Sequence, residues 1–150
     1  MLSLSLRGFG LLVLVAPTYR KRRHARKRLP LACPPINTDL LKDARSLYAS
    51  GHHVAAAMTA RVEIERQLTL LAMTRPDFGN EWRGVTETAG YLGKKRVLRT
   101  RVYKAVIAAN ATGNLAAHGK GALPQDVLNM FGVIDGLRSA VARHAKGGVA

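Results

Sequence analysis

The sequence predicts an all-α protein, a bundle of four principal helices and one short extra helix. The 150-residue chain is 47% hydrophobic but only 5% aromatic, a composition that favours Ala-, Leu- and Val-rich helices over a β-sandwich. Apolar residues recur at three- and four-residue spacing through most of the chain after Thr38. No segment shows the alternation of a half-buried strand, and there is no Gly-rich phosphate loop.

Residues 1–35 are predicted to be an apolar and basic N-terminal extension without a fold of its own. Its densest apolar run, residues 9–16, is too short to span a bilayer. Three interpretations stay open for the first 16 residues: an unfolded extension, a membrane-surface anchor or targeting peptide, and a cleaved signal peptide. Seven of the nine residues from Arg20 to Arg28 are Lys or Arg, which makes this segment a basic arm able to contact nucleic acid or anionic lipid.

The folded domain is expected to comprise residues 36–150, because prolines 30, 34 and 35 make the preceding stretch an extended linker. Its first helix begins with Thr38 as N-cap and ends at Gly51. A second helix covers about residues 54–73. One broad apolar face is predicted for it, made of Val54, Ala57, Met58, Ile64, Leu68, Leu71 and Ala72.

A loop over residues 75–84 follows, in which Phe78 and Trp82 are expected to serve as a lid or to anchor the chain to the core. A short helix over residues 86–92 then ends at Gly93.

A longer helix is predicted over residues 97–118, and a last amphipathic helix runs from Pro124 to about His144. Gly113 lies inside the longer helix, where glycine costs about 1 kcal/mol relative to alanine, so close packing or a local break is expected. Gly119 is expected in the left-handed conformation that ends a helix.

The formal net charge of +15 favours anionic partners such as nucleic acid or a membrane surface. Much of it lies in the basic arm, since 16 Lys and Arg residues accompany 9 Asp and Glu residues from Ile36 onward. Cys33 is the lone cysteine, so an intrachain disulfide is impossible and a cytoplasmic location is the simplest interpretation. The sequence shows no metal-ligand spacing, no Ser nucleophile motif and no sign of a cofactor.

Arg61 and Glu65 form the first candidate pair, because both fall within the apolar face of the second predicted helix, four residues apart. One interpretation is a buried ion pair that fixes helix register. The other is functional, with Glu65 orienting another polar side chain.

Asn110, Asn114 and His118 form the second candidate set, spaced four residues apart on one helical stripe. They either cap nearby backbone groups or act on a substrate, with His118 as a general acid or base near neutral pH.

The third candidate set is a run of cations around the start of the longer helix. A solvated surface and contact with the nucleic-acid backbone are the two alternatives, since such contact needs only clustered positive charge. The run contains Lys94, Lys95, Arg96, Arg99, Arg101 and Lys104.

Two stretches of the chain resemble the HEPN superfamily, helical bundles that include RNA-cleaving toxins and many stand-alone bacterial domains. Residues 48–65, Tyr-Ala-Ser-Gly-His-His-Val-Ala-Ala-Ala-Met-Thr-Ala-Arg-Val-Glu-Ile-Glu, are similar to a family helix that carries Ala-Arg and then a Glu. Residues 113–119, Gly-Asn-Leu-Ala-Ala-His-Gly, resemble the Gly-Asn-x-Ala-Ala-His ending of the stand-alone domains. The resemblance covers roughly residues 38–144 and implies a four-helix HEPN-like bundle.

Family nucleases carry an Arg some four to six residues before the His, and no Arg stands between Ala111 and Gly113 here. The resemblance therefore implies a non-catalytic domain that binds RNA or a protein partner, such as an antitoxin-like protein, in a defence or toxin–antitoxin setting. The alternatives are a weak metal-independent endoribonuclease that uses His118 with Asn114, Glu65 and Arg61, or a purely structural interaction module. Because family nucleases build their sites across a dimer interface, a homodimer is expected through the face that bears Asn114 and His118.

Overall fold

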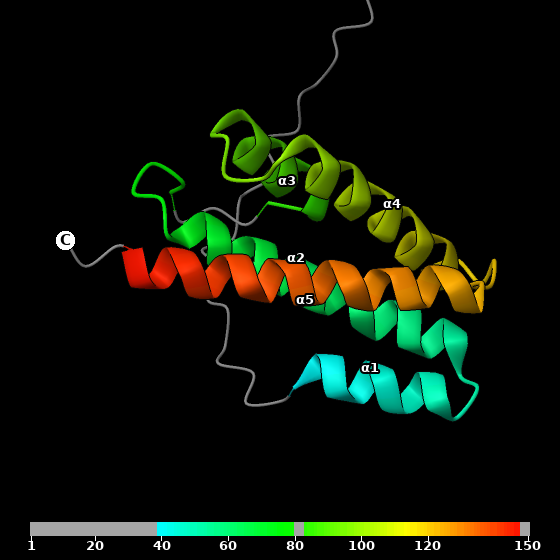
Figure 1. The fold of residues 1–150 in the computed structure, drawn as a ribbon. Coiled ribbons are helices and arrows are strands. Elements are labelled where there is room, and N and C mark those ends of the chain that lie inside the picture. Colours follow the sequence, from blue (N-terminus) through cyan, green and yellow to red (C-terminus); the bar gives the residue numbers. More distant parts are fainter. Residues whose placement is uncertain (1–38, 80–82, 148–150) are drawn as a thin grey trace, which may run out of the picture.

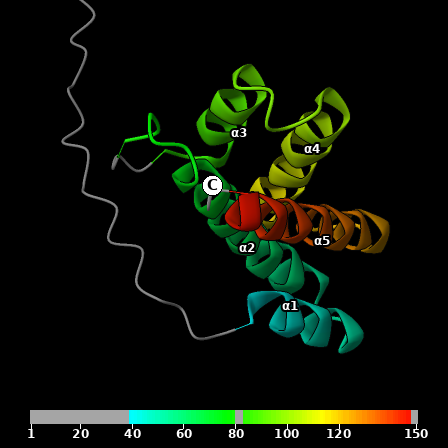
Figure 2. The same cartoon turned by 60° about the vertical axis from the view of Figure 1, so that its left-hand side comes forward.

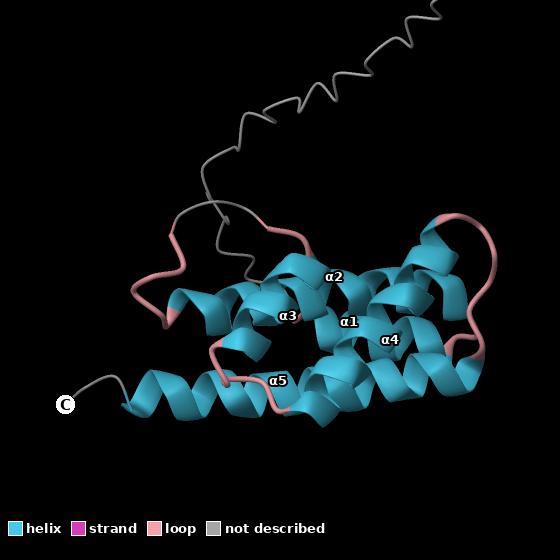
Figure 3. Cartoon of the chain, turned by 90° about the horizontal axis from the view of Figure 1, so that it is seen from above, coloured by secondary structure: helices cyan, strands magenta, loops and turns pink. Residues whose placement is uncertain are grey.

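The part of the chain that the structure describes folds into a bundle of five helices (Figure 1). The computed structural model describes residues 39–79 and 83–147. Within these ranges there are helices and connecting loops but no strand (Figure 3), which confirms the all-helical prediction. The helices are α1 (Leu40–Ala49), α2 (His53–Met73), α3 (Val85–Lys94), α4 (Thr100–Ala117) and α5 (Pro124–Gly147).

The predicted division into four principal helices and one short one is not confirmed, because α1 and α3 are both ten residues long. The predictions for residues 1–35, the domain boundary near Ile36 and the anchoring role of Trp82 fall outside the described residues. Phe78 is anchored as expected, with 2% of its surface exposed. None of the described helices is both long enough and apolar enough to cross a membrane.

Helix α2 is the centre of the bundle and packs against each of the other four helices (Figure 2). A helix surrounded in this way buries side chains on several faces, so one apolar stripe does not describe it. The predicted face is consequently wrong in part. Val54 and Met58 are 39% and 44% exposed, whereas Ala56, Ala60 and Glu63 are fully buried.

Three of the helices end in the same Schellman motif, in which the chain turns through a left-handed residue. That residue is Gly51 after α1, with φ of 80°, and Gly119 after α4, with φ of 70°, as the sequence predicts. After α3 it is Arg96, with φ of 57°, and the Val97 N–H closes the motif by donating to the Leu92 carbonyl at 2.9 Å.

Helix α3 therefore runs one residue past the predicted end at Gly93, and α4 begins at Thr100 rather than Val97. Residues 95–99 connect the two helices and contain the turn at Arg96. The turn places the end of α3 next to the start of α4, and the predicted run of cations lies at this junction.

Candidate functional site

The six cations predicted to contact nucleic acid lie at the junction of α3 and α4, and all six are exposed. Lys94 ends α3, Arg99 is the N-cap residue of α4, and Lys104 lies one turn into α4. We call this set the junction cations: Lys94, Lys95, Arg96, Arg99, Arg101 and Lys104.

Lys95 is the junction cation with an acidic partner among the described residues. Its Nζ forms an ion pair with the Asp77 carboxylate and lies 5.8 Å from the centroid of the Tyr91 ring. The Lys95 ammonium and the Tyr91 hydroxyl, which donates to Asp77 at 2.6 Å, lower the pKa of Asp77 to about 2. The other five junction cations make no ion pair with a described acidic residue, so their charge faces solvent.

The first turn of α4 adds to this positive charge. Its N-cap residue is Arg99, which makes no side-chain cap hydrogen bond, and no acidic residue lies in the turn. The first backbone N–H groups of a helix have no partner within the helix, and the helix dipole is positive at that end. Cations are therefore unfavourable at this position for the helix itself. The arrangement suits an anion such as phosphate.

Arg96 lies in a backbone conformation that favours glycine. A left-handed residue with a Cβ is strained by roughly 1–2 kcal/mol, and the two equivalent helix ends use glycine. Strain of this kind is often kept where a side chain has a task. The strained backbone at Arg96 therefore supports a role for its side chain among the junction cations.

His118 is the C-cap residue of α4 and is exposed, as is Asn114 one turn earlier. The His118 backbone N–H donates to the Asn114 carbonyl at 3.0 Å. Within the described part of the chain, no hydrogen bond or ion pair holds either side chain. The imidazole is therefore accessible but is not oriented by a neighbouring group.

Arg61 contacts α4 rather than Glu65, so the predicted pairing of Arg61 with Glu65 is wrong. Its Nε donates to Asn110 Oδ1 at 3.2 Å, across from α2 to α4. Its side-chain carbons lie over Gly113, where an added Cβ would come within 2.6 Å of the Arg61 Cβ and 2.7 Å of its Cδ. The close packing expected at Gly113 is confirmed.

The four predicted catalytic residues thus do not share one hydrogen-bonded network. The Arg61 Nε is held on Asn110, and the backbone of Asn110 lies eight residues, about 12 Å at 1.5 Å per residue, before that of His118 along the α4 axis. Glu65 is half-buried and makes no hydrogen bond with a described residue. A hollow of about 340 Å³ beside Arg61 is lined mainly by aliphatic groups, including Met58, Val62 and Ala117.

The sequence interpretation missed the buried carboxylate of Glu63, which takes part in more side-chain hydrogen bonds than any other described residue. This side chain has no exposed surface and accepts hydrogen bonds from two arginines and a glutamine. Arg66 donates at 2.7 and 3.0 Å, Arg138 at 2.7 and 3.0 Å, and Gln67 at 2.9 Å. Arg138 also donates to Asp39 at 2.6 Å, so one network joins α2, α5 and the start of α1.

A signal for this network was present in the sequence. Glu63 lies seven residues after Ala56, four before Gln67 and three before Arg66, which are helical spacings for one shared face. Arg138 could not be identified, because it lies 75 residues from Glu63 on another helix. We regard the network as a structural one, since the carboxylate is inaccessible to a substrate.

The described residues contain no group of three or more His, Cys, Asp or Glu side chains that could hold a metal ion. Comparison with protein-family models, with curated proteins and with solved structures finds no match to this chain.

Proposed function

We propose that this chain is a non-catalytic, HEPN-like helical domain that binds RNA through the junction cations. The observation that carries the proposal is a set of exposed cations placed around an uncapped helix N-terminus. Contact with a phosphate backbone requires clustered cations, is strengthened by free backbone donors, and requires no element that reads bases. The resemblance to HEPN domains supports RNA as the nucleic acid.

The positions of His118 and Arg61 support binding without cleavage. Metal-independent RNA cleavage needs a general base for the 2′-hydroxyl and a fixed cation for the charge that develops on the phosphate. His118 would supply the first group, but the Arg61 Nε is held on Asn110, which lies eight residues before His118 on α4. Gly113 offers no room for an arginine of its own, because the side chain of Arg61 lies over it.

The proposal is tested by charge reversal at the junction. Arg101→Glu together with Lys104→Glu changes the charge of the full chain as much as Lys42→Glu together with Lys120→Glu. Both double variants keep the basic arm, and all four side chains are exposed. We expect the junction variant to bind a labelled single-stranded RNA at least about tenfold more weakly, with a log–log salt slope smaller by roughly 1.4, about 0.7 for each cation. Equal weakening by the two variants would show that only total charge matters.

We also propose a homodimer formed through the face of α2 and α4 near Asn114 and His118. Val54, Met58 and Val62 recur every four residues on α2 and are 39–46% exposed, and Leu115 of α4 is 48% exposed. Sedimentation of the native chain and of Met58→Glu tests this, and a native chain that stays monomeric at high concentration contradicts it. The cytoplasmic location and the defence or toxin–antitoxin setting belong to the same proposal and rest on the resemblance.

A further inference from the structure

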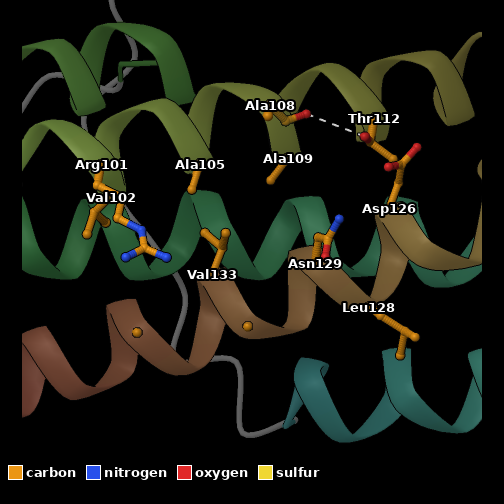
Figure 4. A pocket seen from close by; sticks show the side chains of 12 residues that line it. Arg101, Val102, Ala105, Ala108, Ala109, Thr112, Asp126, Leu128, Asn129 and Val133 are labelled. Atoms are coloured by element: carbon orange, nitrogen blue, oxygen red, sulfur yellow. Dashed lines mark hydrogen bonds between the residues drawn. The ribbon is translucent and has the colours of Figure 1, made fainter.

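An open groove of about 570 Å³ runs between α4 and α5 (Figure 4). Val102 of α4 and Val133 of α5 extend into it, and Leu128 lies at one end with 42% of its surface exposed. Much of the remaining lining is small, with Ala105 and Ala109 on the α4 side. The groove is therefore apolar, and its small lining residues leave room for the side chains of another helix.

A second hollow continues the groove toward the junction of α3 and α4. Val102 and Gly136 line both hollows, and the second adds Leu98, Arg99 and Arg143. On α5 the combined surface extends from residue 126 to residue 143, about 26 Å at 1.5 Å per residue. A helix of about 17 residues would match this length.

Two glycines on α5 are not required by packing within the chain. A Cβ built on Gly132 or Gly136 meets no atom within 4 Å, whereas one on Gly113 meets Arg61 at 2.6 Å. Glycine is less favourable than alanine inside a helix, so the fold itself gains nothing from these two residues. Close approach of another backbone would account for both of them.

The charges along this surface are unequal at its two ends. Arg99, Arg101 and Arg143 lie toward the junction end, and Asp126 is the one carboxylate among the described residues that line the two hollows. Asp135 of α5 faces away toward α1, where it pairs with Arg45 at 2.8 Å. An occupant that complements the surface is therefore acidic at the junction end.

We propose that the α4–α5 groove binds an amphipathic helix of a partner protein that carries acidic residues in its C-terminal half. The apolar face of such a helix would lie over Gly132 and Gly136, and its carboxylates would face Arg101 and Arg143. The helix dipole sets the same orientation, because its positive N-terminal end would lie at Asp126 and its negative C-terminal end at the arginines. The proposal does not rest on RNA binding, although Arg99 and Arg101 belong to both surfaces.

The test uses a designed fluorescent peptide of about 17 residues, with Leu and Ala on one helical face and Glu on the polar face of its C-terminal half. A control peptide carries Lys in place of each Glu. Fluorescence anisotropy of the full chain should show saturable binding of the acidic peptide and at least about tenfold weaker binding of the Lys peptide. Equal affinity for both peptides, or saturation by neither, would overturn the proposal.

The protein variant for this assay is Gly132→Leu with Gly136→Leu, which fills the groove from α5. Leu is a better helix former than Gly, and nothing within 4 Å obstructs the new Cβ atoms, so the variant should fold. Gly90→Leu on α3 is the matched control, because its Cβ also meets no atom within 4 Å and lies outside the groove.

We expect the double variant to bind the acidic peptide at least about tenfold more weakly than the native chain does, and Gly90→Leu to bind it with unchanged affinity. Arg101→Glu should also lower the affinity for the acidic peptide and raise the affinity for the Lys peptide. If the double variant instead disrupts self-association and the native chain binds no peptide, the groove is an interface between two copies and the proposal is wrong. Failure of RNA binding alone, with peptide binding intact, would overturn only the proposed function.

Discussion

Replacement of the buried carboxylate Glu63 by Gln should destabilise the fold strongly. The side chain keeps its shape but loses its charge, and the five hydrogen bonds that it accepts come from Arg66, Arg138 and Gln67. Removal of one partner from a buried ion pair costs about 3–5 kcal/mol. The side chains of Arg66 and Arg138 are 22% and 31% exposed and can regain some hydration, so we expect about 3 kcal/mol.

The assay is urea unfolding of the full chain followed by far-UV circular dichroism, with Glu65→Gln as the matched control. Glu65 is half-buried and makes no ion pair with a described residue, so its replacement should change the free energy of unfolding by less than about 0.5 kcal/mol. Since a domain of this size is stabilised by only about 5–15 kcal/mol, the difference between the two variants is readily measured. Equal effects at the two positions would refute the assignment of Glu63 as the centre of the network.

The pH dependence of stability provides a second readout of the same network. Burial by itself would raise the pKa of Glu63, but the hydrogen bonds from Arg66, Arg138 and Gln67 outweigh it and hold the pKa below its ordinary value. The Arg138 hydrogen bond likewise lowers the pKa of Asp39. A carboxylate with a lowered folded-state pKa stabilises the fold above the unfolded-state pKa, and this contribution is lost as the pH falls through the folded-state value. The native chain should therefore lose stability below about pH 4, and Glu63→Gln should show a smaller loss.

Three further predictions concern packing, strain and the N-terminal extension. Gly113→Ala should destabilise the fold by about 1–3 kcal/mol in urea unfolding, because the added Cβ overlaps Arg61. Gly113→Arg should destabilise it more and should not produce RNase activity. An unchanged unfolding midpoint for Gly113→Ala would contradict the close contact. Arg96→Gly should raise the free energy of unfolding by about 1 kcal/mol, because it relieves the strain of the left-handed backbone. The same variant should bind RNA more weakly. A loss of stability would show that the Arg96 side chain packs on the fold. Deletion of residues 1–35 should leave a single cooperative thermal transition, and loss of cooperativity would show that the extension packs on the core.

The helices could be predicted because their boundaries depend on local chemistry. Gly51 and Gly119 end helices as expected, since the left-handed turn favours a residue without a Cβ. The end of α3 was missed by one residue, because Arg96 occupies that conformation and nothing in its chemistry indicates it. The buried face of α2 was misjudged for a tertiary reason, since a helix with four packing partners has no single apolar stripe.

The candidate site could be predicted only where the residues are neighbours in sequence. The junction cations lie together because the chain between Lys94 and Lys104 is short. The partners of Arg61 and Glu63 depend on the way in which helices pack, because Asn110 and Arg138 lie 49 and 75 residues away. The two charged residues expected to pair therefore do not, and the buried ion pairs of Glu63 were not predicted.

The central claim is that the chain binds RNA without cleaving it. The most direct measurement incubates a labelled single-stranded RNA with the native chain and with His118→Ala in the presence of a metal chelator, and scores bound and cleaved RNA in the same samples. We expect both proteins to bind the RNA with similar affinity, because His118 is not a junction cation, and neither to cleave it. Cleavage by the native chain that disappears in His118→Ala would contradict the claim and identify His118 as the general acid or base of a ribonuclease.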